Sequence, residues 1–188
     1  MGIYFLRHEQ RPMDDPSFYT NLTVEGLYNA KNLATVLKKN NITKIYCSPF
    51  IRCLQTIHPY VKDTKLKVNI DWGIQESFHH YIFSKHNYTK LSKDELEFYN
   101  YNKDYKTTMK PNVLKYQETL QSIHDRVLNF FLKIKLDDKN SDENILICTH
   151  MGIINMLLTF FKIERKINSL YLMGRLSTIK NNKLQFLN

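Results

Sequence analysis

Three segments far apart in the sequence carry side chains that could bind and attack an anion. One apolar run ends in Arg7 and His8, and a second apolar run ends in His150. Arg52 lies near the start of a third segment, which predicts a helix. Ligands of open parallel α/β sheets bind at the carboxyl ends of the strands. We therefore expect these four side chains to line one pocket.

Such a set of cations suits a phosphate group. Planar guanidinium groups grip oxyanions through paired hydrogen bonds, and the main-chain amides of a helix starting at Ser48 would add donors. A neutral imidazole can attack phosphorus directly to form a phosphohistidine. The surrounding cations would then neutralise the charge on the transferring phosphoryl group.

Strand and helix patterns alternate along the rest of the chain. Apolar runs predict strands, and apolar residues at helical spacing predict helices. The predicted strands are 3–6, 42–47, 66–70, 144–148, 170–172, 177–179 and 184–187, and the predicted helices are 23–40, 48–61, 92–101, 118–135 and 152–161. This order predicts an α/β fold, a three-layer α/β/α sandwich with a mostly parallel central sheet.

Local signals refine these elements. Thr23 and Ser48 are suitable N-caps, and Pro49 suits the first position of a helix. Pro59 should kink or shorten the second helix, and residues 66–70 alternate like a half-buried strand. The predicted buried faces are Leu27, Ala30, Leu33, Ala34 and Leu37 in the first helix, and Leu120, Ile123, Val127, Leu128 and either Phe130 or Phe131 in the fourth.

Length and composition favour one domain over residues 1–188, with a loop-rich insertion at about 71–112 that would act as a lid or binding loop.

No apolar run is long enough to span a membrane and no signal peptide is visible. Three cysteines without framework spacing favour a reduced, cytoplasmic protein. The net charge of +9 comes from dispersed lysines, so the sequence does not favour a nucleic-acid partner. The oligomeric state is left open.

Four ordered motifs resemble the signature set of the histidine phosphatase superfamily, the phosphoglycerate-mutase-like proteins. They are Arg7-His8, the run Ser48-Pro49-x-x-Arg52-x-x-Gln55-Thr56, the loop Ile74-Gln75-Glu76, and Thr149-His150-x-Gly152. Two further segments are similar to helices of that family, namely Leu22-Thr23-x-x-Gly26-x-x-x-Ala30 and Glu118-Thr119 followed by Asp125-Arg126.

The resemblance implies a role for each motif residue. His8 would be the nucleophile, and Arg7, Arg52 and His150 would hold the phosphate. Glu76 would be the general acid that protonates the leaving oxygen. Glu25, Glu95 and Glu97 are alternatives, which we interpret instead as solvated helix charges.

The sequence departs from the family pattern beside the nucleophile. Glu9 replaces the usual Gly, and its carboxylate could repel an anionic substrate or take over proton transfer. Its main-chain carbonyl could still orient the imidazole. Gln10 fits the next family position, while Arg11 replaces a small hydroxyl residue, and both are candidate substrate contacts. Met151 stands where a second Gly is frequent and would narrow the pocket.

We expect a phosphomonoester phosphatase that needs neither cofactor nor metal. Its partner would be a small phosphorylated substrate such as a sugar phosphate, a nucleotide or a phosphopeptide, contacted by Tyr81, Lys85 and Lys90. Two alternatives stay open: a phosphoglycerate mutase, and a degenerate member that binds phosphorylated ligands or a partner protein without turnover.

Two other chemistries fit the sequence less well. A cysteine phosphatase loop needs five residues between Cys and Arg, but only four separate Cys47 from Arg52. Cys47 and Cys148 are better explained as small buried strand residues. A metal cluster of His79, His80 and His86 would lack flanking cysteines or spaced carboxylates.

Overall fold

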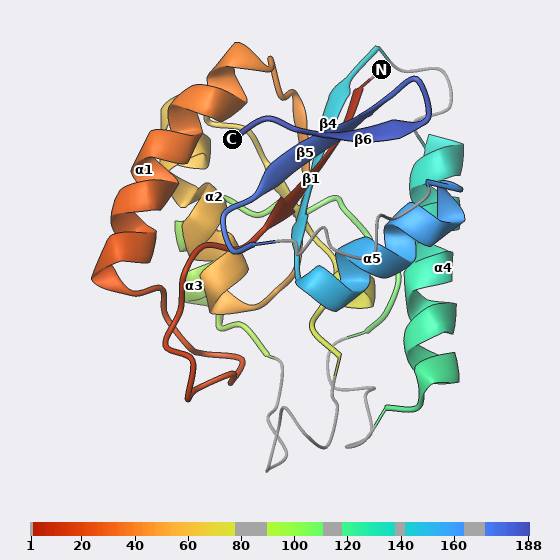
Figure 1. Cartoon of the computed structure of the whole chain (residues 1–188). Coiled ribbons are helices and arrows are strands. Elements are labelled where there is room, and N and C mark those ends of the chain that lie inside the picture. Colours follow the sequence, from red (N-terminus) through yellow and green to blue (C-terminus); the bar gives the residue numbers. More distant parts are fainter. Residues whose placement is uncertain (1, 78–89, 111–117, 138–141, 164–171) are drawn as a thin grey trace.

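One sheet of six strands organises the part of the chain that the computed structural model describes, which is residues 2–77, 90–110, 118–137, 142–163 and 172–188 (Figure 1). The strands are β1 (Gly2–Arg7), β2 (Lys44–Cys47), β3 (Val68–Ile70), β4 (Asn144–Thr149), β5 (Leu176–Lys180) and β6 (Lys183–Phe186). Their order is β3-β2-β4-β1-β5-β6. The first four strands are parallel, whereas β5 and β6 pair antiparallel. The mostly parallel sheet is thus confirmed.

Helices cover both faces of this sheet, which confirms the three-layer sandwich (Figure 1). One layer holds α1 (Val24–Lys39), α2 (Ile51–Thr64) and α3 (Lys93–Phe98). The other layer holds α4 (Leu120–Asp137) and α5 (Met151–Phe160), and the short 3-10 helix η1 (Trp72–Ile74) contacts α4. None of the helices in the described part of the chain is long and apolar enough to cross a membrane.

The central strands supply two separate cores because successive strand residues point to opposite faces. Leu6 of β1 and Cys148 of β4 join the core beneath α1 and α2. Their neighbours Phe5 and Ile147 join the core beneath α4 and α5. Burial on both faces explains the nearly continuous apolar runs that precede His8 and His150.

The predicted cap at Ser48 is wrong. Helix α2 begins only at Ile51, with Phe50 as an N-cap that makes no side-chain hydrogen bond. The Ile51 amide donates to the carbonyl of Phe18, 3.2 Å away, so it is already occupied. Ser48 instead places its Oγ 2.9 Å from His150 Nε2. A tertiary contact has therefore overridden a local helix signal.

Two further expectations about local structure are corrected. Pro59 lies inside α2, which continues to Thr64 instead of ending near residue 61. Strand β3 is buried throughout, not half-buried, because the segment after α3 covers its edge. Val68 receives a hydrogen bond there from the amide of Asn102 and donates one to the carbonyl of Asn100.

Two leucines that we expected on buried helix faces are exposed, Leu27 by 42% and Leu120 by 74%. Leu120 is the first residue of α4 and precedes the turn at which the helix meets the core through Ile123. In α1 the close contact is made by Gly26, the neighbour of Leu27. A side chain built at Gly26 would overlap the main-chain carbonyl oxygen of Gln10.

The contact at Gly26 yields a stability prediction. Gly26→Ala should lower the free energy of unfolding by about 1–3 kcal/mol, because the loop after His8 must move to admit a methyl group. Gly152→Ala is the matched control, since nothing lies within 4 Å of its added Cβ. That variant should be neutral, or more stable by up to about 1 kcal/mol because Ala favours a helix. Urea unfolding measures both, and equal stability of the two variants would contradict this packing.

Candidate active site

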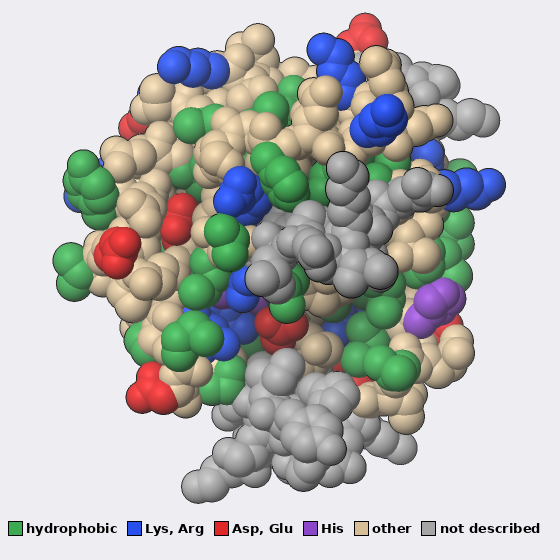
Figure 2. Space-filling model, viewed as in Figure 1, with side chains coloured by type: hydrophobic (Ala, Val, Ile, Leu, Met, Phe, Trp, Pro, Cys, Tyr) green, Lys and Arg blue, Asp and Glu red, His purple; other side chains and the backbone are tan. Residues whose placement is uncertain are grey.

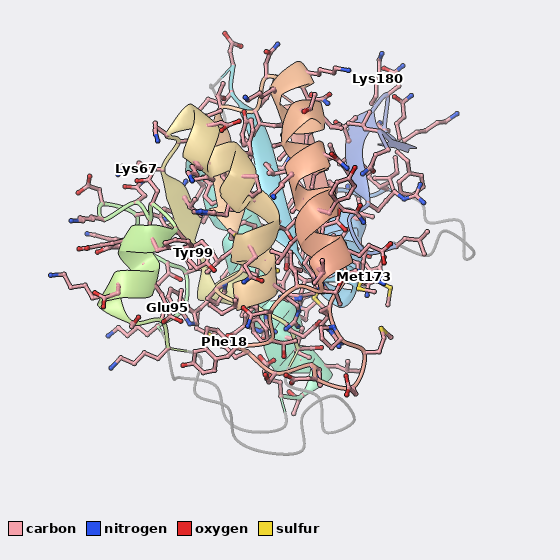
Figure 3. All side chains as sticks on the ribbon, turned by 90° about the vertical axis from the view of Figure 1, so that its left-hand side faces the viewer. Phe18, Lys67, Glu95, Tyr99, Met173 and Lys180 are labelled. Carbon is pink, nitrogen blue, oxygen red and sulfur yellow. The ribbon has the colours of Figure 1, made fainter. Side chains whose placement is uncertain are left out.

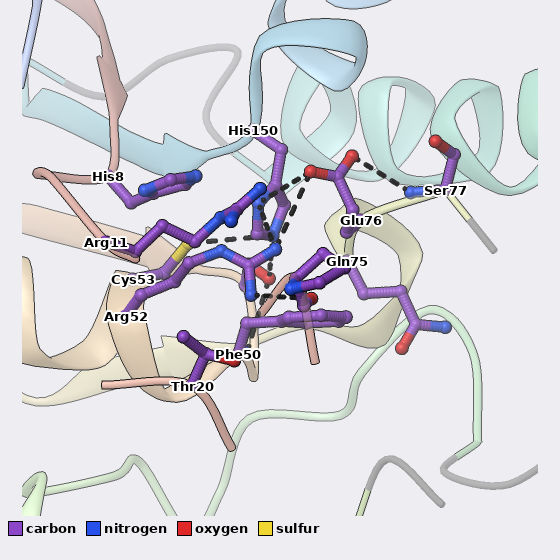
Figure 4. Close-up of polar contacts among 12 residues, drawn as sticks. His8, Arg11, Thr20, Phe50, Arg52, Cys53, Gln75, Glu76, Ser77 and His150 are labelled. Atoms are coloured by element: carbon purple, nitrogen blue, oxygen red, sulfur yellow. Dashed lines mark hydrogen bonds and ion pairs between the residues drawn. The ribbon is translucent and has the colours of Figure 1, made fainter. Parts of the chain in front are cut away.

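Four side chains from separate elements converge on one hollow (Figure 4). His8 follows β1, Arg52 lies in α2, Glu76 follows η1, and His150 follows β4. The ring centroids of His8 and His150 are 5.3 Å apart. Figure 2 shows basic and acidic side chains meeting at the lower centre of the view, where the carboxyl ends of the central strands lie in Figure 1.

His8 is held by the main chain that follows it. Its Nδ1 lies 2.8 Å from the carbonyl oxygen of Glu9. A carbonyl can only accept, so we assign the ring proton to Nδ1, which leaves the lone pair on Nε2. Burial, reinforced by Arg52 and then Arg7, holds the pKa of His8 well below its usual value. The imidazole is therefore neutral near pH 7, which is its nucleophilic form.

The Glu9 carboxylate does not lie beside the cluster, so the expectation that it would face a substrate is wrong. The carboxylate packs against Gly174 and lines a separate pocket with Asn29 of α1. The main chain of Glu9 serves the site instead. Its carbonyl orients His8, and its amide donates to Thr56 Oγ1 at 2.9 Å.

Arg52 is completely buried. One terminal nitrogen donates to the carbonyl of Ser17 at 2.8 Å, and the other lies 3.6 Å from the Glu76 carboxylate. Its Nε is buried and makes no hydrogen bond to any residue that the structure describes. A buried donor without an acceptor is costly, and a phosphate oxygen would satisfy it.

His150 is also fully buried, and both of its ring nitrogens face polar groups. Nε2 lies 2.9 Å from Ser48 Oγ and Nδ1 lies 3.3 Å from the Glu76 carboxylate. An Arg52 terminal nitrogen, which can only donate, also lies 3.4 Å from Nδ1. We assign the proton to Nδ1, because the carboxylate is the nearer of these two partners and the Ser48 hydroxyl can donate to Nε2. Burial, Arg52 and then His8 hold the pKa of His150 well below its usual value. Neutral His150 can therefore donate one hydrogen bond to an anion in the hollow.

A buried ion pair fixes the loop that carries Glu76. Arg126 of α4 donates to the carbonyls of Gly73 at 2.7 Å, Gln75 at 3.0 Å and Glu76 at 3.3 Å. The Glu118 carboxylate holds the same guanidinium through two bonds of 2.7 and 3.0 Å. Sequence reasoning noted both residues but assigned them no role.

Arg7 lies at the edge of the cluster. One of its terminal nitrogens is 3.8 Å from the sulfur of Met151, the residue expected to narrow the pocket. Burial lowers the pKa of Arg7, which the charge of Glu76 partly offsets.

Gln10 and Arg11, the two candidate substrate contacts, lie against different parts of the structure. The Gln10 side-chain oxygen accepts from the Thr23 hydroxyl at 3.0 Å, so this part of the side chain anchors the loop to the start of α1. Arg11 donates to the carbonyls of Pro12 and Asp15, and Figure 4 shows its side chain beside the cluster. Arg11 is thus the one of these two residues whose side chain is seen beside the cluster.

The other acidic candidates lie elsewhere. Glu95 caps α3 through the amide of Ser92, while Glu25 and Glu97 are exposed. No group of three metal-ligating side chains occurs within the described ranges. His79, His80, His86, Tyr81 and Lys85 lie outside those ranges, and Lys90 is exposed.

All three cysteines are free and buried, which confirms the packing role expected for Cys47 and Cys148. Cys53 Sγ lies 3.6 Å from His150 Nε2. Burial raises the pKa of the Cys53 and Cys148 thiols well above the usual value. These thiols stay protonated near pH 7, which is unsuited to a cysteine nucleophile.

One family of known proteins matches most of this chain. The family model described as the histidine phosphatase superfamily (branch 1) matches residues 3–174. The adenosylcobalamin/alpha-ribazole phosphatase of Escherichia coli is 24% identical over 163 residues, covering 84% of this chain and 77% of that protein. A probable phosphatase of Schizosaccharomyces pombe is 26% identical over 170 residues, covering 88% of this chain and 75% of that protein.

A solved structure shows the same fold. The ecdysone phosphate phosphatase from Bombix mori, in complex with tungstate, superimposes with a TM-score of 0.76 at 14% identity. The match covers 100% of this chain and 92% of that chain.

The two buried imidazoles predict how stability depends on pH. The pKa of each is lower in the folded chain than the value of about 6.5 in the unfolded chain. As the pH falls below about 6.5, the unfolded chain binds protons first, so each histidine removes up to about 1.4 kcal/mol of stability per pH unit. Urea unfolding at about pH 7 and about pH 5 should show that His150→Gln loses less free energy of unfolding over this pH range than the wild type does. An unchanged pH slope would contradict the neutral, buried state of His150.

Proposed function

The chain belongs to the histidine phosphatase superfamily, and we propose that it hydrolyses phosphomonoesters through a phosphohistidine on His8. Phosphatase activity is supported by the names of the relatives described above. The observation that carries the mechanism is the orientation of His8. Its Nδ1 is tied to the Glu9 carbonyl, and Nε2 is the nitrogen left to attack.

In the first step, His8 Nε2 attacks phosphorus and the bond from phosphorus to the leaving oxygen breaks. Arg7, Arg52 and His150 hold the non-bridging oxygens and offset their charge. Glu76 gives a proton to the leaving oxygen. A bound dianion would compete with Glu76 for Arg52 and His150, now 3.6 and 3.3 Å from its carboxylate.

In the second step, water attacks phosphorus and the bond from phosphorus to His8 breaks. The Glu76 carboxylate takes a proton from that water, which restores the starting state and releases phosphate. The side chains supply the positive charge that this proposal requires, so we infer that no metal takes part. Full activity after treatment with a chelator would support this part of the proposal, and its loss with recovery on adding a metal would contradict it.

The substrate is proposed to be a small phosphorylated molecule such as a sugar phosphate, a nucleotide or a phosphopeptide. Relatives are named for small phosphorylated substrates, among them alpha-ribazole phosphate and glucosyl-3-phosphoglycerate. Arg11 is proposed to contact the substrate, and Gln10 to do so through its amide nitrogen. Tyr81, Lys85 and Lys90 stay predicted contacts from the insertion. We further propose a cytoplasmic location, in keeping with three free thiols.

A phosphoglycerate mutase and a non-catalytic binding protein are the competing functions. A Glu9 carboxylate beside the substrate would repel it and so favour a binding protein without turnover, but this carboxylate lines another pocket. Rapid quenching after mixing with a phosphate ester distinguishes the three functions. A phosphoenzyme that water discharges supports a phosphatase. One that discharges only to phosphoglycerate indicates a mutase, and the absence of any phosphoenzyme indicates a binding protein.

The assignment of the nucleophile predicts that His8→Ala lowers kcat/KM by at least about 10⁴-fold, because no other group can form the intermediate. His124→Ala is the matched control, since His124 lies on α4 away from the cluster and is partly exposed. It should retain activity. A folded His8→Ala protein with near wild-type turnover would rule out this nucleophile.

The role of Glu76 predicts a dependence on the leaving group. Glu76→Gln should lower kcat/KM for an alkyl phosphate by about 10²–10⁴-fold, because kcat/KM reports the first step and an alkoxide needs a proton to leave. The loss for p-nitrophenyl phosphate should be much smaller, because nitrophenolate leaves without protonation. Equal losses for both substrates would show that Glu76 acts by some means other than acid catalysis of departure.

A further inference from the structure

A second pocket lies beside α1, and the Glu9 carboxylate is part of its wall. Helix α1 contributes Asn29, Asn32 and Val36, while Met173 and Gly174 come from the loop before β5. Figure 3 shows Met173 beside the N-terminal half of α1. The cavity measures about 370 Å³, which is within the usual range of small-molecule sites.

The Glu9 carboxylate in this wall has no cation to balance it among the residues that the structure describes. Glu9 is only 6% exposed, and its side chain is stabilised by Asn29 and the amide of Gln10. Burial nevertheless raises the pKa of Glu9, so these two neutral donors do not compensate for lost solvation. A cation with its own donors would supply what they lack.

Arg175 also lines the pocket, but its contacts lead elsewhere. Its terminal nitrogen donates to the main-chain oxygen of Asn188 at 3.0 Å, and its guanidinium lies 5.1 Å from the centre of the Phe186 ring. These contacts hold Arg175 against the C-terminal segment. These contacts of Arg175 thus leave the Glu9 carboxylate facing the cavity.

The Glu9 carboxylate can occupy this position in the pocket wall because the residue opposite it is a glycine. Any side chain at Gly174 would overlap the carboxylate, and its φ of +74° is one that other residues rarely adopt. The Gly174 amide also donates to the carbonyl of His8 at 3.0 Å. The floor of the pocket is therefore tied to the end of β1 and is well defined.

We propose that this pocket binds a small organic cation, an amidinium, guanidinium or primary ammonium group carried on an apolar body, through the Glu9 carboxylate. A planar cation can pair with both carboxylate oxygens, and the pair is strengthened by the low polarity of a buried site. The side chains of Leu33, Val36 and Leu172 supply an apolar wall for the rest of the ligand. The ligand class goes beyond the phosphatase reaction, which does not use this carboxylate.

Titration calorimetry of the full chain with benzamidinium chloride tests the proposal, with benzamide as the neutral analogue of the same shape. Benzamidinium should bind with one-to-one stoichiometry. Benzamide should bind at least about tenfold more weakly, because it cannot form the charged pair. The variant Glu9→Gln keeps the shape of the side chain and should weaken benzamidinium binding by at least about tenfold.

Two control variants test which of the two sites binds the cation. Glu25→Gln removes an exposed charge from α1, the helix that lines the pocket. Glu76→Gln removes the carboxylate of the candidate active site. Both should change the affinity by less than roughly twofold, and saturating inorganic phosphate should not compete. Asn32→Trp alters an exposed residue at the pocket and should block binding even if Glu9→Gln fails to fold.

The proposal is overturned by any of three results. The first is no binding of benzamidinium to the wild type. The second is equal affinity for the wild type and a folded Glu9→Gln or Asn32→Trp variant. The third is loss of binding in Glu76→Gln together with competition by phosphate, which would place the cation in the candidate active site.

Discussion

The hydrogen bond from His8 Nδ1 to the carbonyl of Glu9 is the contact on which the site depends, because it decides which ring nitrogen keeps its lone pair for the proposed attack. That carbonyl is itself held in place. The Glu9 amide donates to Thr56 of α2, and the His8 carbonyl accepts from Gly174. Two segments far apart in the sequence therefore fix one imidazole. The replacement of the usual Gly by Glu9 leaves this arrangement intact because it uses only the main chain.

The rest of the fold brings charged groups to that imidazole. The parallel pairing of β1 with β4 sets His8 beside His150. Arg126 of α4 anchors the loop that carries Glu76. It lies in the helix layer opposite the one that holds Arg52 of α2. Breaking the buried pair of Arg126 and Glu118 would leave an uncompensated charge. The proposed acid, the cation and the proposed nucleophile thus come from three layers that only the complete fold holds in register.

The sequence predicted the parts of the site that strand ends and motifs define. His8, His150 and Arg52 follow from apolar runs and a predicted helix, and they do meet. Ser48 was predicted as a helix cap, but it bonds His150, since tertiary contacts override local preference. The role of Arg126 and the direction of the Glu9 side chain could not be predicted, because both depend on contacts between distant segments.

The most direct test of this account is the identification of the phosphorylated atom. Wild-type protein is mixed with a phosphate ester, quenched rapidly, and its phosphoenzyme examined by mass spectrometry and by nuclear magnetic resonance of phosphorus and nitrogen. The account predicts one phosphoryl group, on Nε2 of His8, because Nδ1 is committed to the Glu9 carbonyl. Phosphate on Nδ1 of His8, or on any other residue, would contradict it.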